Sequence, residues 1–277
     1  MKSRTIIYLT ILLQISCYQT DHNVVNLNNN KIEALGHAGM GISNSYPINT
    51  FESITYALAL GADGTEIDVQ LSKDGVLVAY HDLLLQSSTN GSGTIKESNW
   101  KDIEDLYYDI TPYHDYKIVS LQNIFKHTEN LSQYRFALDC KTYTGEYVAE
   151  RDSAFFQQYA HGLVQLLEQY DLPANTVIEA VDLQLFKFIR KYSDDYLLFL
   201  PTNDLLANIE VAETQKLNGF VARFDQVSID DIAKVHDRGL QVILYNTQSK
   251  KDNIEAIEKN PDMIQSDRLK HLINALK

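Results

Sequence analysis

Apolar and polar positions alternate along most of this 277-residue chain in a way that predicts strands and helices in turn. Short apolar runs bounded by turn residues predict strands at 32–37, 64–70, 76–81, 135–140, 176–180, 196–200, 219–224, 241–245 and 262–266. Apolar residues that recur every three or four positions predict helices at 50–60, 120–131, 152–170, 182–192, 204–217, 229–238, 251–259 and 267–276. Such alternation is typical of an α/β fold with a parallel sheet.

The segment 61–82 carries the most informative polar pattern. Glu66 and Asp68 lie two positions apart in a predicted strand, so both side chains point to one face, while the apolar residues beside them point to the other. Two neighbouring inward-facing acids repel each other at neutral pH unless a cation or a shared proton compensates them. His81 follows the next predicted strand and indicates acid–base chemistry beside a metal. The alternative is an ordinary strand with a polar, half-exposed face.

Further motifs surround this segment, and together they resemble the glycerophosphodiester phosphodiesterase family. They are Gly36-His37-Ala38-Gly39, Pro47-Ile48-Asn49-Thr50, Lys73-Asp74-Gly75, His81-Asp82 and Asp139-Cys140-Lys141. In the family the corresponding pattern runs His-Arg-Gly, Pro-Glu-Asn-Thr, an acidic block, Lys-Asp-Gly, His-Asp and Glu-x-Lys. The match is dense from residue 33 to 95 and thinner afterwards, where Tyr245 and Ser266-Asp267 resemble an aromatic position and a final Thr-Asp.

The resemblance implies a role for each matching position. His37 and His81 correspond to the general acid and base, and Lys141 to the lysine that contacts the phosphate. Glu66, Asp68 and Asp139 correspond to the metal ligands. Three carboxylates form an oxygen-only set that suits Ca²⁺ or Mg²⁺ better than Zn²⁺.

Three positions depart from the family pattern. Ala38 replaces the arginine that contacts phosphate, Ile48 replaces a glutamate, and Asp139 is one methylene shorter than the usual glutamate ligand. Arg223 is a candidate replacement cation, and a surface position beyond a strand end is its alternative.

The function implied by the resemblance is metal-dependent hydrolysis of glycerophosphodiesters to glycerol 3-phosphate and an alcohol, a step of lipid metabolism. The departures leave two alternatives open. One is a phosphodiesterase or lyase that acts on another lipid or sugar phosphodiester. The other is a catalytically inactive, membrane-tethered binding protein.

The candidate residues lie at the C-terminal ends of early strands, which favours a (β/α)8 TIM barrel over an open doubly wound sheet. The resemblance implies the barrel of the phosphatidylinositol-phospholipase-C-like phosphodiesterases. Nine strands are predicted for eight places, so one is either accessory or wrongly predicted. The link Leu71–Gly75 is too short for a crossover helix, so it is either an extended connection between parallel strands or a turn into an antiparallel one. The resemblance implies the former.

Residues 83–119 form the longest irregular stretch and follow His81 directly. We expect this insertion to lie over the barrel mouth, where its aromatic residues would either cover the substrate alcohol or form a separate small cluster.

Composition and the N-terminus narrow the setting. A net charge of −13 makes nucleic acid an improbable partner, and the expected ligand is a small-molecule phosphodiester. Residues 1–16 resemble a signal peptide, and Cys17 a lipidation site of a bacterial lipoprotein. Residues 17–30 form a polar tether, and 31–277 the barrel domain. We therefore expect an exported periplasmic or cell-surface lipoprotein, in preference to a freely secreted one, whose only membrane contact is the lipid anchor.

The oligomeric state is left open by these patterns. The remaining histidines are expected to face solvent: His22, His114, His127, His161, His236 and His271.

Overall fold

The computed structural model describes residues 25–42, 45–110, 112–142, 153–172, 174 and 176–277. Eight parallel strands close into a barrel, because the first strand of the sheet pairs with both the second and the last. These strands are β1 (Glu33–Gly36), β2 (Gly64–Leu71), β5 (Arg135–Cys140), β6 (Thr176–Glu179), β7 (Leu197–Pro201), β8 (Gly219–Arg223), β9 (Gln241–Thr247) and β10 (Met263–Ser266). The predicted TIM barrel is confirmed.

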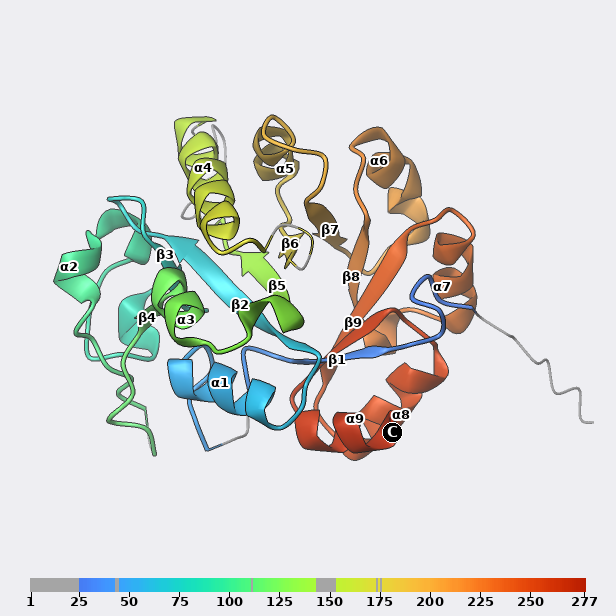
Figure 1. Ribbon diagram of the computed structural model, residues 1–277, viewed down its shortest axis with the longest axis horizontal. Coiled ribbons are helices and arrows are strands. Elements are labelled where there is room, and N and C mark those ends of the chain that lie inside the picture. Colours follow the sequence, from blue (N-terminus) through green and yellow to red (C-terminus); the bar gives the residue numbers. More distant parts are fainter. Residues whose placement is uncertain (1–24, 43–44, 111, 143–152, 173, 175) are drawn as a thin grey trace, which may run out of the picture.

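Helices surround the strands on the outside of the barrel (Figure 1). They are α1 (Phe51–Ala59), α3 (Leu121–His127), α4 (Ser153–Gln169), α5 (Leu183–Ile189), α6 (Ile209–Thr214), α7 (Ile229–His236), α8 (Lys250–Glu258) and α9 (Leu269–Ala275). Each coincides with a predicted helix, because its apolar stripe packs on the barrel. Side-chain caps mark several starts, as where Thr50 accepts a hydrogen bond from the Ser53 N–H.

The additional predicted strand, 76–81, is accessory and antiparallel. β3 (Leu77–Ala79) pairs antiparallel with the last residues of β2, and β4 (Val119–Ser120) pairs antiparallel with β3. The extended parallel connection implied by the resemblance is therefore wrong. The link 72–76 forms a tight turn closed by the Ser72 N–H, which donates to the Val76 carbonyl, and a turn this short can join only antiparallel strands.

The barrel has an apolar interior below its C-terminal mouth. Inward-facing residues of seven strands form this inner core: Leu35, Ala137, Val177, Phe199, Val221, Ile243 and Met263. A second, larger core lies between the outer faces of the strands and the helices. Because strand side chains alternate, the next inward position toward the mouth is two residues further along each strand.

The insertion 83–119 packs largely on itself and on β3. Tyr80, Leu85, Ile95 and Tyr108 belong to a third cluster of buried side chains, separate from the barrel cores. The segment includes α2 (Trp100–Ile103) and lies on the outer side of β3 in Figure 1. One contact runs back toward the mouth, where the Tyr108 hydroxyl donates to the Ile48 carbonyl (2.9 Å). The packing matches the separate-cluster alternative, and a role in covering substrate stays a prediction.

The N-terminal segment requires a corrected boundary. Residues 1–24, including the expected signal peptide and Cys17, lie outside the described residues. The Asn26 amide donates to the Pro261 carbonyl (2.9 Å), and the Leu27 N–H donates to the Asp262 carboxylate (2.8 Å). The last part of the predicted tether is thus held against the start of β10 by hydrogen bonds. In the described part of the chain, we find no helix with the length and apolarity needed to cross a membrane.

One predicted surface histidine is buried. The His236 side chain is 4% exposed, and its Nε2 is hydrogen-bonded to the Asp262 carboxylate at 3.0 Å. The prediction that His236 faces solvent is wrong, because the carboxylate that binds its Nε2 is 26 residues away in the sequence.

Gly64 allows β2 and β5 to approach closely. A Cβ at this position would lie 1.8 Å from the Arg135 carbonyl oxygen, whereas one at Gly162 in α4 would have no neighbour closer than 3.8 Å. We expect Gly64→Ala to lower the free energy of unfolding by about 1–3 kcal/mol, because a strand must shift. The matched control Gly162→Ala should raise it by about 0.5–1 kcal/mol. Denaturant unfolding measures both, and equal values for the two variants would contradict this packing.

Candidate active site

The barrel mouth carries a layer of polar side chains above the inner core. On three strands the inward residue nearest the C-terminal end is polar and follows an apolar one by two positions, as in Ala137–Asp139, Val177–Glu179 and Met263–Gln265. Glu66 and Asp68 occupy the corresponding face of β2. The period-two pattern therefore places an acidic site directly on an apolar floor.

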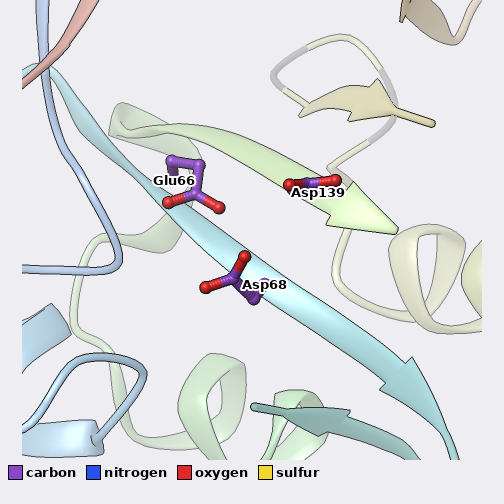
Figure 2. A group of neighbouring side chains, drawn as sticks. All are labelled: Glu66, Asp68 and Asp139. Carbon is purple, nitrogen blue, oxygen red and sulfur yellow. The ribbon is translucent and has the colours of Figure 1, made fainter. Parts of the chain in front are cut away.

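Glu66, Asp68 and Asp139 form the centre of this layer (Figure 2). One carboxylate oxygen from each lies within 4.8 Å of the others. They come together because Asp68 and Asp139 are register partners on the neighbouring parallel strands β2 and β5. Glu66 and Asp68 are 2% and 1% exposed. Asp139 is partly exposed, and three acids at this separation, two of them buried, need compensation.

Asp68 receives that compensation from two loops. Lys141 Nζ lies 2.8 Å from its Oδ1 and also forms an ion pair with Asp139. The Asn49 side-chain amide donates to its Oδ2 (2.7 Å), and the Asp68 N–H donates back to the Asn49 side-chain Oδ1 (3.0 Å). Burial alone would raise the pKa of Asp68, but Lys141, His81 and the hydrogen bonds lower it below its ordinary value. Asp68 is therefore the member of the cluster whose charged form is best stabilised.

Glu66 is compensated differently. The Ala38 N–H donates to its Oε2 (2.7 Å), and the backbone of Ala38 is left-handed, with φ of 47°. This conformation turns the amide hydrogen of the loop after β1 inward. Burial and the neighbouring charge of Asp68 raise the pKa of Glu66 well above its usual value. Burial likewise raises the pKa of Asp139. Without a cation, burial and mutual repulsion therefore favour the protonated forms of Glu66 and Asp139.

His37 stands at the edge of the cluster in a fixed orientation. Its Nδ1 is hydrogen-bonded to the Asp267 carboxylate (2.8 Å), and its Nε2 lies 4.0 Å from Glu66. Burial alone would lower its pKa, but the hydrogen bond to Asp267 and the charges of Glu66, Asp267 and Asp68 raise the pKa to about 9. Nε2 is thus the nitrogen that faces the acids.

His81 follows β3 and is more open to solvent. Its side chain is 49% exposed, and its Nδ1 is hydrogen-bonded to Asp82 at 3.0 Å. Asp82 in turn accepts a hydrogen bond from the Ser88 hydroxyl at 2.5 Å. A positive charge on His81 lowers the pKa of both Asp68 and Asp139. The His81 imidazole therefore lies on their side of the mouth.

The candidate replacement cation does not join this group. Arg223 is half-exposed and makes two hydrogen bonds to the Asp225 carboxylate, at 3.1 and 2.9 Å. Among the described residues, Lys141 is the one lysine or arginine paired with the three clustered carboxylates. The surface alternative for Arg223 describes its position better.

Three residues of the site were not predicted as such. Asn49 appeared only inside the motif Pro47–Thr50, and Asp267 only as part of a late motif, although each holds a predicted site residue in place. Glu179 carried no signal beyond its place at a strand end. It is 2% exposed, accepts a hydrogen bond from the Gln265 amide (2.6 Å), and has a pKa raised by burial and Asp139 to about 8.

The donor set fits a hard divalent cation. Glu66, Asp68 and Asp139 would hold it through oxygen atoms, as Ca²⁺ and Mg²⁺ require. The pKa values of Glu66 and Asp139 are raised, because the nearby positive charge does not fully compensate the negative charge of the cluster. A divalent ion would supply the missing charge.

Comparison with known proteins agrees with this geometry. A family model described as the glycerophosphoryl diester phosphodiesterase family matches residues 40–271. The chain is 45% identical over 69 residues to a glycerophosphodiester phosphodiesterase of Caldanaerobacter subterraneus, a stretch that covers 25% of this chain and 28% of that protein. It is 42% identical over 67 residues to one of Bacillus altitudinis, covering 24% and 27%. These matches span less than a third of either relative.

Solved structures share the fold over nearly the whole barrel. A phosphodiesterase of Oleispira antarctica, solved with the product sn-glycerol 3-phosphate, superposes with a TM-score of 0.76 at 19% identity, covering 88% of this chain and 96% of that one. A glycerophosphodiester phosphodiesterase of Agrobacterium tumefaciens gives 0.72 at 18% identity, covering 88% and 99%. The family match extends over most of the described barrel and includes the carboxylate cluster, so this chain belongs to the glycerophosphoryl diester phosphodiesterase family.

Proposed function

We propose that this protein hydrolyses glycerophosphodiesters to glycerol 3-phosphate and an alcohol, with the help of a divalent cation. The observation that carries the proposal is the convergence of Glu66, Asp68 and Asp139 with Lys141 and His37 at one mouth of the barrel. The Oleispira relative, which was solved with the glycerol 3-phosphate product, supports the same substrate class.

The site offers positive charge where a phosphodiester needs it. A bound divalent ion would act as a Lewis acid on the phosphoryl oxygens and orient the substrate. Lys141 adds a positive charge beside the same carboxylates, where negative charge grows in the transition state. Burial of the acids keeps their side chains ordered before substrate arrives, so little reorganisation is needed.

The two imidazoles supply proton transfer. One accepts the proton of the attacking hydroxyl, and the other donates a proton to the leaving alcohol oxygen. Asp267 holds Nε2 of His37 toward the cluster, and Asp82 contacts Nδ1 of His81 in the same way. Each such transfer is worth about 10²–10⁴-fold in rate.

Ala38 favours a second candidate outcome. A loop that contributes only a backbone N–H at this position lacks the arginine that the family pattern has for phosphate. A cyclic phosphate formed by attack of a neighbouring glycerol hydroxyl would then be held less firmly for the second, hydrolytic step. The enzyme would in that case release a cyclic product as a lyase, or prefer another lipid or sugar phosphodiester.

The first prediction from the proposed function concerns phosphodiesterase activity. With Ca²⁺ or Mg²⁺, the protein should release choline from glycerophosphocholine, and His37→Ala should lower kcat by roughly 10²-fold or more. His114→Ala, which removes an exposed histidine paired with Asp109, is the matched control and should leave kcat unchanged. Phosphorus NMR of the products separates hydrolysis from cyclisation. Equal turnover by His37→Ala and the parent would reject the assigned site, and inactivity of the parent on every diester tried would favour a binding protein.

The second prediction concerns metal and pH. Glu66 and Asp139 have raised pKa values in the metal-free protein, so a cation must displace protons from them. Metal affinity should therefore fall as pH is lowered, and binding should release protons into the buffer. Calorimetry in buffers of different ionisation enthalpy measures this release.

The control for this measurement is a second buried glutamate. Glu66→Gln should weaken metal binding by roughly tenfold or more, because one charge-assisted contact to the ion is lost. Glu179→Gln should keep one ion per chain, because Glu179 is bonded to Gln265 and is not part of the three-carboxylate group. Binding that is independent of pH, or equal losses in the two variants, would contradict the assignment.

The third prediction concerns the partner of His37. Asp267→Asn removes a carboxylate that raises the pKa of His37, so this pKa should fall from about 9 toward the ordinary value of 6.5. NMR titration of the imidazole in the metal-free protein measures the shift, and kcat should fall by roughly 10²-fold because Nε2 is no longer oriented. Asp109→Asn, which alters an exposed Asp–His pair, is the control. An unchanged titration of His37 in Asp267→Asn would refute the role of Asp267.

A further inference from the structure

A cavity of about 560 Å³ lies beside the mouth, between the loops that follow β9 and β10. Its wall includes Gln248, Lys250, Asp267, Arg268 and Lys270. Three of these side chains are cationic and exposed to solvent: Lys250, Arg268 and Lys270. We call this the cationic pocket. Such a cluster is notable in a chain whose net charge is −13.

The cations of the pocket are available to a ligand. Within the described residues, none of the three forms an ion pair with a carboxylate, whereas four other arginines do: Arg135, Arg190, Arg223 and Arg238. Arg268 is nevertheless held in place, because its Nε donates to the Gln248 carbonyl oxygen (2.9 Å) and so ties the two loops together. Its terminal nitrogens form a fork suited to a phosphate or carboxylate.

The position in the barrel points to the same chemistry. β9 and β10 are the seventh and eighth strands of the parallel barrel. The loops after these two strands are the usual location of phosphate sites in TIM barrels. Asp267, at the wall of the pocket, also binds His37, so the pocket adjoins the proposed catalytic site.

We propose that the cationic pocket is a second anion-binding subsite, which takes a phosphate group through Lys250, Arg268 and Lys270. The phosphate could belong to the alcohol half of a substrate or arrive as a free effector, and both sources present the same dianionic group. A polyanion such as nucleic acid is disfavoured, because the rest of this acidic surface would repel it.

The binding test uses inorganic phosphate and the full chain. Calorimetric titration should show that Arg268→Gln/Lys270→Gln weakens phosphate binding roughly tenfold or more. Lys187→Gln/Lys234→Gln removes two exposed lysines of α5 and α7 and should bind like the parent. Lys250→Gln/Lys270→Gln leaves the Arg268–Gln248 contact intact, so it tests the pocket even if the first variant unfolds. Unchanged phosphate affinity and stoichiometry in both pocket variants would overturn the proposal.

The kinetic test identifies the source of the phosphate and rests on the proposed function. If the substrate carries it, the pocket variants should raise KM roughly tenfold for a glycerophosphodiester with a phosphorylated alcohol, and leave KM for glycerophosphocholine within about twofold. If the phosphate binds as a free effector, added phosphate should change the turnover of glycerophosphocholine by the parent and not by the pocket variants.

The two proposals can fail separately. Phosphate binding at the pocket by a protein that cleaves no diester would reject only the proposed function. Hydrolysis of glycerophosphocholine with phosphate binding unaffected by the pocket variants would reject only the pocket.

Discussion

The burial of negative charge at the barrel mouth is the constraint on which the rest of the site depends. Glu66 and Asp68 are almost fully buried above an apolar floor, with Asp139 beside them. Removing carboxylates from water is costly unless hydrogen bonds and cations replace the lost hydration. Two loops make those replacements: the loop after β1 through the Ala38 N–H and the Asn49 amide, and the loop after β5 through the Lys141 ammonium group. The loops around the mouth are therefore ordered by the same charges that would hold a metal.

The placement of positive charge distinguishes this chain from the family pattern. The position of the usual arginine is a left-handed alanine whose backbone, instead of its side chain, serves the site. Arg223 forms an ion pair with Asp225. Cations without a carboxylate partner among the described residues gather instead beside the loops after β9 and β10, around a cavity that shares Asp267 with the proposed catalytic centre. This distribution suits a substrate or effector whose anionic groups are spread across the mouth.

The strands and helices and the pair Glu66 and Asp68 were predictable from local periodicity, whereas the place of Asp139 in the cluster was implied by the family resemblance. Alternation within β2 fixes the common face of Glu66 and Asp68, and apolar stripes fix the helices. Contacts between distant segments were not predictable in this way. The pairing of His37 with Asp267 spans 230 residues, and His236 is buried only because Asp262 reaches it. The direction of β3 was missed because the resemblance outweighed the short link that argued for a turn.

The most direct test of this account is to locate a bound ion. A crystal soaked in Mn²⁺, a stand-in for Ca²⁺ or Mg²⁺ that can be identified by anomalous scattering, should show one strong peak within about 2–2.6 Å of oxygens from Glu66, Asp68 and Asp139. A mouth without such a peak at saturating Mn²⁺, or a peak bound only by other residues, would contradict the claim that these three carboxylates form a metal site.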